Sequence, residues 1–137
     1  MRVTEQHVSR IPLDNLRVRR EEFAAVWAAA EAQDDGADWY VAGVVVTCRW
    51  LAGATVRSST GRSYVASSPI SRSATTAHEE LIEAEYLAAE SLGERQPDLC
   101  RSRPGWCNGI RATLRWAWRR NGPAPLAVAS VATAAPA

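Results

Sequence analysis

The sequence predicts a mainly α-helical protein: a compact bundle of about four helices with a long Ser/Arg-rich loop and a flexible C-terminal tail. Hydrophobic residues make up 47% of the 137 residues and charged residues 23%, which is typical of a folded domain. Apolar residues recur at helical spacing in several segments. The last segment, by contrast, contains neither a charge nor an aromatic residue.

The length fits one domain, because dividing the chain would leave two marginal cores. We place the helical domain at residues 1–122 and the tail at residues 123–137, whose sequence is PAPLAVASVATAAPA. Such a low-complexity segment cannot readily form a core of its own. We expect residues 1–17 to form an arm on the domain, and no internal repeat is evident.

The first two helices are predicted over residues 18–33 and 39–53. The first has an apolar face made of Phe23, Val26, Trp27 and Ala30. The second follows Asp38, a good N-cap residue, and ends near Gly53. Its run of β-branched residues favours a buried strand instead, whereas its length favours a helix. We predict a central buried helix, with a buried strand as the alternative.

The Ser/Arg-rich loop follows at residues 54–73 and could contain a short hairpin about Thr60 and Gly61. A third helix is predicted from a capping box at Thr76 and Glu79 to about Leu92. A fourth helix is predicted over residues 104–120, because Pro104 suits a first helical turn and Asn121-Gly122 suits a stop.

A stripe of arginines on the fourth helix is the leading candidate for a partner-binding site. It contains Arg111, Arg115 and Arg119, with Trp116 and Trp118 nearby. Arginine and tryptophan are enriched at binding hot spots. We therefore predict a small accessory or regulatory protein that binds another protein or itself. The alternative is intramolecular, with these arginines pairing with acidic residues of the third helix.

Nucleic-acid binding is the second functional hypothesis, because arginines beside aromatic residues also bind phosphates and bases. The loop arginines would extend that surface: Arg57, Arg62 and Arg72. The net charge of only +1 gives this hypothesis no general support.

Glu85 lies within the apolar arc of the third helix, so burial would require a partner. Arg49 is the lone charge on the second helix, and we predict a structural ion pair between Arg49 and Glu85. His78 lies on the same side of the third helix. A small enzyme centred on Glu85 and His78 is therefore the third functional hypothesis.

Three cysteines at irregular spacing make a disulfide framework or a zinc site improbable, and no phosphate-binding or dinucleotide-binding motif is present. The N-terminus lacks a secretory signal, and the longest apolar stretch is too short to span a bilayer. We expect a cytoplasmic protein without a metal, a cofactor or a membrane span. All sixteen basic residues are arginine, which reflects either a coding bias, the explanation we favour, or a preference for planar, stacking cations.

Overall fold

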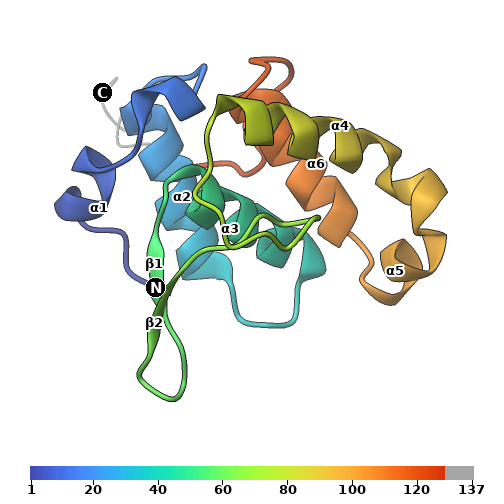
Figure 1. The fold of residues 1–137 in the computed structure, drawn as a ribbon, viewed down its shortest axis with the longest axis horizontal. Coiled ribbons are helices and arrows are strands. Elements are labelled where there is room, and N and C mark those ends of the chain that lie inside the picture. Colours follow the sequence, from blue (N-terminus) through green and yellow to red (C-terminus); the bar gives the residue numbers. More distant parts are fainter. Residues whose placement is uncertain (129–137) are drawn as a thin grey trace, which may run out of the picture.

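The computed structural model describes residues 1–128 and confirms a mainly helical, compact fold (Figure 1). In the described part, the fold contains six α-helices and one two-stranded sheet. The elements in chain order are α1 (Glu5–Ser9), the 3-10 helix η1 (Leu13–Asn15), α2 (Arg20–Gln33), α3 (Trp39–Leu51), β1 (Thr55–Arg57), β2 (Ser63–Val65), α4 (Glu79–Arg95), α5 (Pro97–Ser102) and α6 (Trp106–Ala117).

The buried segment after Asp38 is a helix, α3, and not a strand. The Asp38 carboxylate accepts hydrogen bonds from the backbone N–H groups of Tyr40 and Val41, at 2.9 and 3.4 Å, and so caps the first turn. The β-branched residues are tolerated because α3 is buried between neighbouring helices, where packing outweighs intrinsic propensity.

The ends of the third predicted helix were wrong. Its capping box does not form, since α4 begins at Glu79 after His78, which makes no side-chain cap. The helix also continues through Gly93 and ends just before α5, which begins at Pro97. The sequence pattern missed α5 and α1 altogether, because neither short helix has an apolar stripe long enough to recognise.

Two glycines allow α3 and α6 to cross at the centre of the molecule with their backbones in contact. A Cβ atom added at Gly43 would lie 2.4 Å from the carbonyl oxygen of Trp106. One added at Gly109 would lie 2.3 Å from the carbonyl oxygen of Tyr40. Both distances are shorter than any van der Waals contact, so only glycine permits this crossing.

The glycine contacts are reciprocal, because the contacted residue stands three positions before the glycine in each helix. The two helices also share the pattern Gly-x-x-x-Thr-x-Arg-Trp, as GVVVTCRW at residues 43–50 and GIRATLRW at residues 109–116. In both, the threonine hydroxyl donates to the glycine carbonyl oxygen at 2.7 Å. The expectation of no internal repeat was therefore wrong.

The helices that precede α3 and α6 extend this repeat. Each places an aromatic residue four positions before a glutamate, Trp27 and Glu31 in α2 and Tyr86 and Glu90 in α4. Each glutamate binds the arginine of the shared pattern through two hydrogen bonds. The core thus contains two similar helix pairs, α2–α3 and α4–α6, which meet where α3 crosses α6. Because α5 is inserted into the second pair, the repeat has no fixed period in the sequence.

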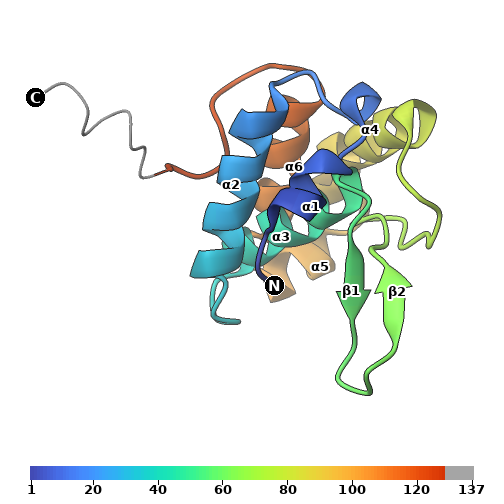
Figure 2. The same ribbon diagram turned by 90° about the vertical axis from the view of Figure 1, so that its left-hand side faces the viewer.

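The predicted hairpin is present and projects beyond the helices (Figure 2). β1 and β2 are antiparallel, with Val56 opposite Tyr64, and Gly61 supplies a positive φ of 86° in the connecting turn. Most of its side chains are exposed. The hairpin therefore contributes little to the core and presents its side chains to the surroundings.

The first residues after α6 pack on the helices. Pro125 is buried, and the Tyr40 hydroxyl donates to its carbonyl oxygen at 2.8 Å. Residues 129–137 of the predicted tail lie outside the described residues, and the domain boundary at residue 122 stays a prediction. Within residues 1–128, no helix has the length and apolar character needed to cross a membrane.

Candidate functional site: an arginine-lined pocket

The arginines of the predicted partner-binding face pair within the chain. Arg115 donates two hydrogen bonds of 2.6 Å to Glu90 on α4, and Arg111 lies 3.8 Å from the same carboxylate. Arg119 lies 2.5 Å from Glu83, which also accepts the indole N–H of Trp118 at 2.8 Å. The geometry matches the intramolecular alternative.

The tryptophans of that face belong to the core rather than to an open surface. Trp116 is only 6% exposed and stacks on Phe23 with ring centroids 6.2 Å apart. Trp118 is 8% exposed, and Arg17 lies 4.1 Å above its ring. Partner binding by Trp116, Trp118 and the three arginines stays a prediction, and it would have to displace these contacts.

The predicted ion pair between Arg49 and Glu85 was wrong. Arg49 instead binds Glu31 of α2, with hydrogen bonds of 2.7 and 2.8 Å from its Nε and Nη2 atoms. Glu85 is 4% exposed and accepts the backbone N–H groups of Ile70 and Ser71, at 2.9 and 3.1 Å, and the Ser71 hydroxyl. No sequence pattern predicts that backbone N–H groups of a loop, rather than a cation, donate hydrogen bonds to the buried Glu85 carboxylate.

The Glu31 carboxylate is contacted by two positive groups and one neutral donor. Burial raises its pKa, but hydrogen bonding and charge from Arg49, the Trp27 indole N–H and the N-terminal ammonium outweigh burial, so the pKa lies below its ordinary value. Glu31 is therefore ionised at neutral pH and cancels the charge of Arg49.

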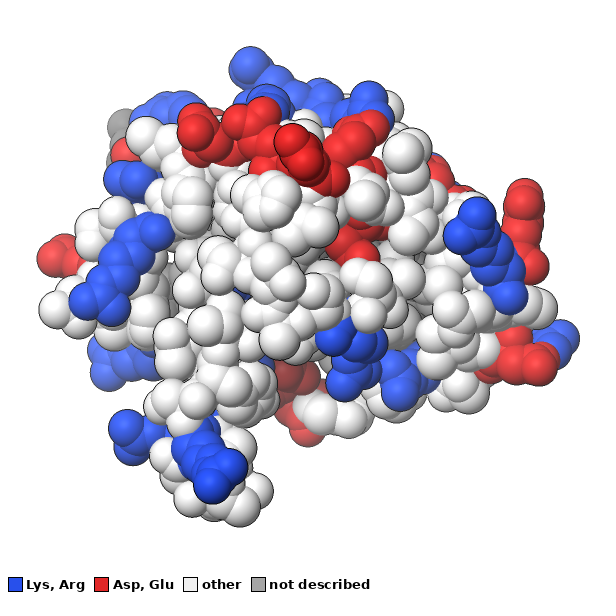
Figure 3. All heavy atoms as spheres, in the orientation of Figure 1, with Lys and Arg blue, Asp and Glu red and all other residues white. Residues whose placement is uncertain are grey.

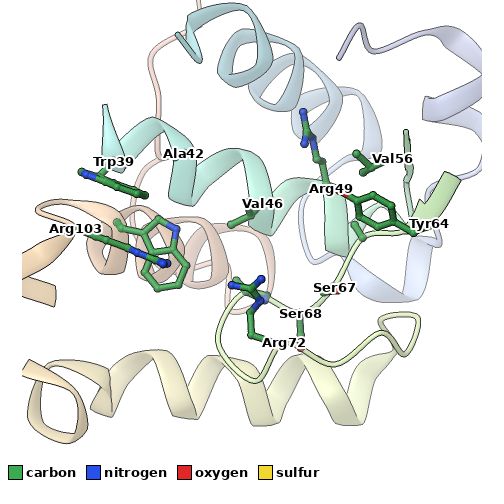
Figure 4. A pocket seen from close by; sticks show the side chains of 13 residues that line it. Trp39, Ala42, Val46, Arg49, Val56, Tyr64, Ser67, Ser68, Arg72 and Arg103 are labelled. Atoms are coloured by element: carbon green, nitrogen blue, oxygen red, sulfur yellow. The ribbon is translucent and has the colours of Figure 1, made fainter. Parts of the chain in front are cut away.

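A pocket of about 320 Å³ opens beside Arg49 (Figure 4). Its apolar wall consists of Ala42 and Val46 from α3 and Val56 from β1. Figure 4 shows Trp39 and Arg103 at one end, Arg49 and Tyr64 at the other, and Arg72 between them. The full lining comprises Trp39, Ala42, Val46, Arg49, Val56, Tyr64, Ala66, Ser67, Ser68, Pro69, Arg72, Arg103 and Trp106.

Two of the three pocket arginines have no carboxylate partner among the described residues. The Arg103 guanidinium lies 5.3 Å from the ring centre of Trp39 and 5.0 Å from that of Trp106. Arg72 makes no side-chain hydrogen bond or ion pair within residues 1–128. Since Glu31 neutralises Arg49, Arg72 and Arg103 supply the uncompensated positive charge, and the pocket wall contains no acidic residue.

Several hydrogen bonds hold the loop that carries Arg72. Ser68 accepts the backbone N–H of Ser73 at 2.8 Å, and its carbonyl oxygen accepts the N–H of Arg72 at 3.1 Å. Glu85 fastens the same loop to α4. Arg72 has a φ of 59°, which is unusual for a residue other than glycine and persists only where surrounding contacts impose it.

Charge is unevenly distributed over the molecule. Figure 3 shows carboxylates gathered along the upper edge, over α4, and basic side chains on the hairpin at the lower left. Residues 39–78 contain four arginines, Arg49, Arg57, Arg62 and Arg72, and no Asp or Glu. This acid-free stretch was visible in the sequence, but the contribution of Trp39, Arg103 and Trp106 depends on α3 meeting the α5–α6 connection.

Among residues 1–128, the remaining reactive side chains form no second site of this kind. Burial raises the pKa of the Cys48 thiol well above its usual range. Burial and a hydrogen bond with Cys100 raise the pKa of Cys107 to about 12. No hydrogen bond links His78 with Glu85 in residues 1–128, and no three His, Cys, Asp or Glu side chains gather there as metal ligands would.

Comparison of the chain with protein-family models, with curated proteins and with solved structures finds no match.

Proposed function

We propose that the protein is a small accessory protein that binds a partner protein, and that the pocket receives an acidic side chain of that partner. The observation that carries this proposal is the presence of two arginines, Arg72 and Arg103, without carboxylate partners in the described part, beside an aromatic and apolar wall. Guanidinium groups bind carboxylates through charge-assisted, often paired hydrogen bonds.

The pocket can also bury an apolar group of the partner next to its acidic side chain. Its volume of about 320 Å³ is at the small end of the range for ligand sites, and such sites combine an apolar lining with a few fixed polar groups. The stacking of Arg103 on Trp39 and Trp106 restricts the guanidinium before binding, which lowers the entropy lost on association.

Nucleic-acid binding is the second candidate, and the acid-free stretch over residues 39–78 favours it. The hairpin adds Arg57 and Arg62, and Tyr64, which is 51% exposed, could stack on a base. We rank it second because acidic residues elsewhere reduce the net charge to +1, and phosphate binding benefits from an overall positive field.

A photo-crosslinking amino acid placed at Tyr64 tests the proposal inside cells or in lysate. We expect discrete crosslinked protein bands that disappear when both Arg72 and Arg103 are replaced by Gln. The control is the same crosslinker at Leu87, which is 55% exposed on α4 and does not line the pocket.

Two results would contradict the proposal. Crosslinks at Tyr64 that survive the double substitution would show that the pocket arginines do not bind the partner. Nuclease-sensitive crosslinks whose yield falls steeply with salt would instead establish the nucleic-acid candidate.

A further inference from the structure

The internal repeat relates the arginine pocket to a second surface of the same molecule. Ala112 and Arg115 on α6 occupy the repeat positions of Val46 and Arg49 on α3, because both pairs follow the shared glycine by three and six residues. Ala112 and Arg115 line a smaller cavity of about 220 Å³. The arginine pocket and this cavity are therefore equivalent faces of the two helix pairs.

The chain itself lies along the second of these faces. Residues 121–125 form the other wall of the smaller cavity, and Ala124 and Leu126 pack on the core around the buried Pro125. The segment is PAPL in sequence, and it is anchored where the Tyr40 hydroxyl donates to the carbonyl oxygen of Pro125. An aromatic donor thus holds a proline-containing segment, which bends at Pro125 and Leu126, against the helix pair.

The arginine pocket has the equivalent donor without an acceptor. Trp106 stands three residues before Gly109, as Tyr40 stands three residues before Gly43. Trp106 lines the arginine pocket, and its indole N–H donates to no atom of residues 1–128. In this half of the molecule, the chain following the helix forms the hairpin and the next loop, which line the far side of the pocket and supply no acceptor for Trp106.

Building on the proposed function, we infer that the arginine pocket binds an extended, proline-containing segment of the partner with an acidic residue next to the proline. A carbonyl oxygen of the segment accepts the Trp106 indole N–H, as that of Pro125 accepts the Tyr40 hydroxyl. The acidic side chain binds Arg72 and Arg103. Proline suits this role because it holds the segment extended before binding and adds its ring to an aromatic surface.

A fluorescein-labelled peptide, DPAPLAVD, provides the probe. Its centre repeats the sequence of residues 123–128, and its aspartates supply the acidic side chains. One comparison peptide replaces both prolines by alanine, and the other replaces both aspartates by lysine. Fluorescence anisotropy measures their binding to the full chain and to its variants at moderate salt.

We expect the probe to bind more tightly than either comparison peptide, by roughly tenfold, which corresponds to the loss of one good polar contact or of the extended conformation. The R72Q/R103Q variant should weaken binding of the probe by a similar factor. The matched control is R95Q/R101Q, which removes the same charge from exposed arginines of α4 and α5 outside the pocket, and it should bind as the wild type does.

Substitution of Trp106 by Phe isolates the indole donor, and its thermal melt shows whether the fold survives. We expect a folded W106F protein to bind the probe more weakly. Equal affinity for the probe and the alanine peptide would overturn the inference about proline. If the lysine peptide still binds more weakly in that case, the proposed function, recognition of an acidic partner, stands. Binding that R72Q/R103Q leaves unchanged would overturn both the inference and the proposed use of the pocket.

Discussion

Individual carboxylates connect the core of this protein to its surface. The Glu31 side chain is 3% exposed and holds Arg49 in the wall of the pocket. Glu85, buried on α4, holds the loop that carries Arg72. Neither carboxylate lines the pocket. Both hold arginines that line the pocket, Arg49 and Arg72. Replacing either glutamate therefore disturbs the pocket without removing a group that would touch a ligand.

Glu31 is predicted to make stability depend on pH. Because its pKa is lowered in the folded protein, its contribution is complete above the ordinary value of 4.5 and is lost as the pH falls through the folded pKa. Glu31→Gln should cost roughly 3 kcal/mol at neutral pH, since it leaves Arg49 without its partner. Urea unfolding at neutral pH and below 4.5 measures both effects. A variant whose stability falls with acid as steeply as that of the wild type would contradict the assignment.

Glu85→Gln is predicted to release the loop. The new amide group would place N–H donors against the N–H groups of Ile70 or Ser71, and we expect a loss of about 1–3 kcal/mol in the free energy of unfolding. It should also weaken binding of the labelled peptide, because Arg72 loses its fixed position. Glu94→Gln, at an exposed glutamate of the same helix, is the control. Unchanged urea unfolding would show that the contacts of Glu85 contribute nothing.

At the scale of the elements, the crossing of α3 and α6 organises the fold. The crossing brings Trp106 from the start of α6 to the outer side of α3, where Trp39 and Arg103 complete the pocket. The hairpin and the loop that follows it form the opposite wall. The pocket therefore exists only if the two helices approach as closely as their glycines allow.

Glycine-to-alanine substitutions are predicted to have opposite signs in different helices. Gly43→Ala and Gly109→Ala force a methyl group against a backbone carbonyl and should destabilise the fold by about 1–3 kcal/mol or more. Gly93→Ala in α4 meets nothing within 4 Å and should stabilise it by about 0.4–1 kcal/mol, because alanine restricts the unfolded chain. The melting temperatures of the three variants, compared with that of the wild type, measure these changes in stability. Destabilisation by Gly93→Ala, or tolerance at Gly43, would contradict the described crossing.

For the whole molecule, the repeat means that two similar helix pairs have acquired different surroundings. Residues after α6 pack against one pair, while the hairpin and the arginine pocket stand beside the other. Close intramolecular ion pairs hold both units together, with Glu31 and Arg49 in one and Glu90 and Arg115 in the other. The segment after α6 therefore covers its helix pair as part of the fold, whereas the segment after α3 leaves the arginine pocket as the proposed binding surface.

Truncations test the boundary of the domain. Removal of residues 129–137 should leave the melting temperature unchanged, because that segment offers no aromatic residue or charge to bury. Removal of everything after Gly122 also deletes the buried Pro125 and the bond from Tyr40, and should cost about 1–2 kcal/mol while melting stays cooperative. Loss of cooperative melting in the shorter protein would place residues 123–128 within the essential core.

The sequence is enough to predict the helical class, the approximate positions of α2, α3, α4 and α6, and the hairpin, because these depend on local spacing, caps and turn residues. It also contains the acid-free stretch, residues 39–78, which supplies Arg49 and Arg72 to the pocket. The pairing of Arg49 with Glu31, the binding of Glu85 to a loop and the contact of Arg103 with Trp39 emerge only in the folded chain. Those contacts join residues far apart in the chain, and their partners follow from the glycine-controlled crossing of two helices rather than from any local pattern.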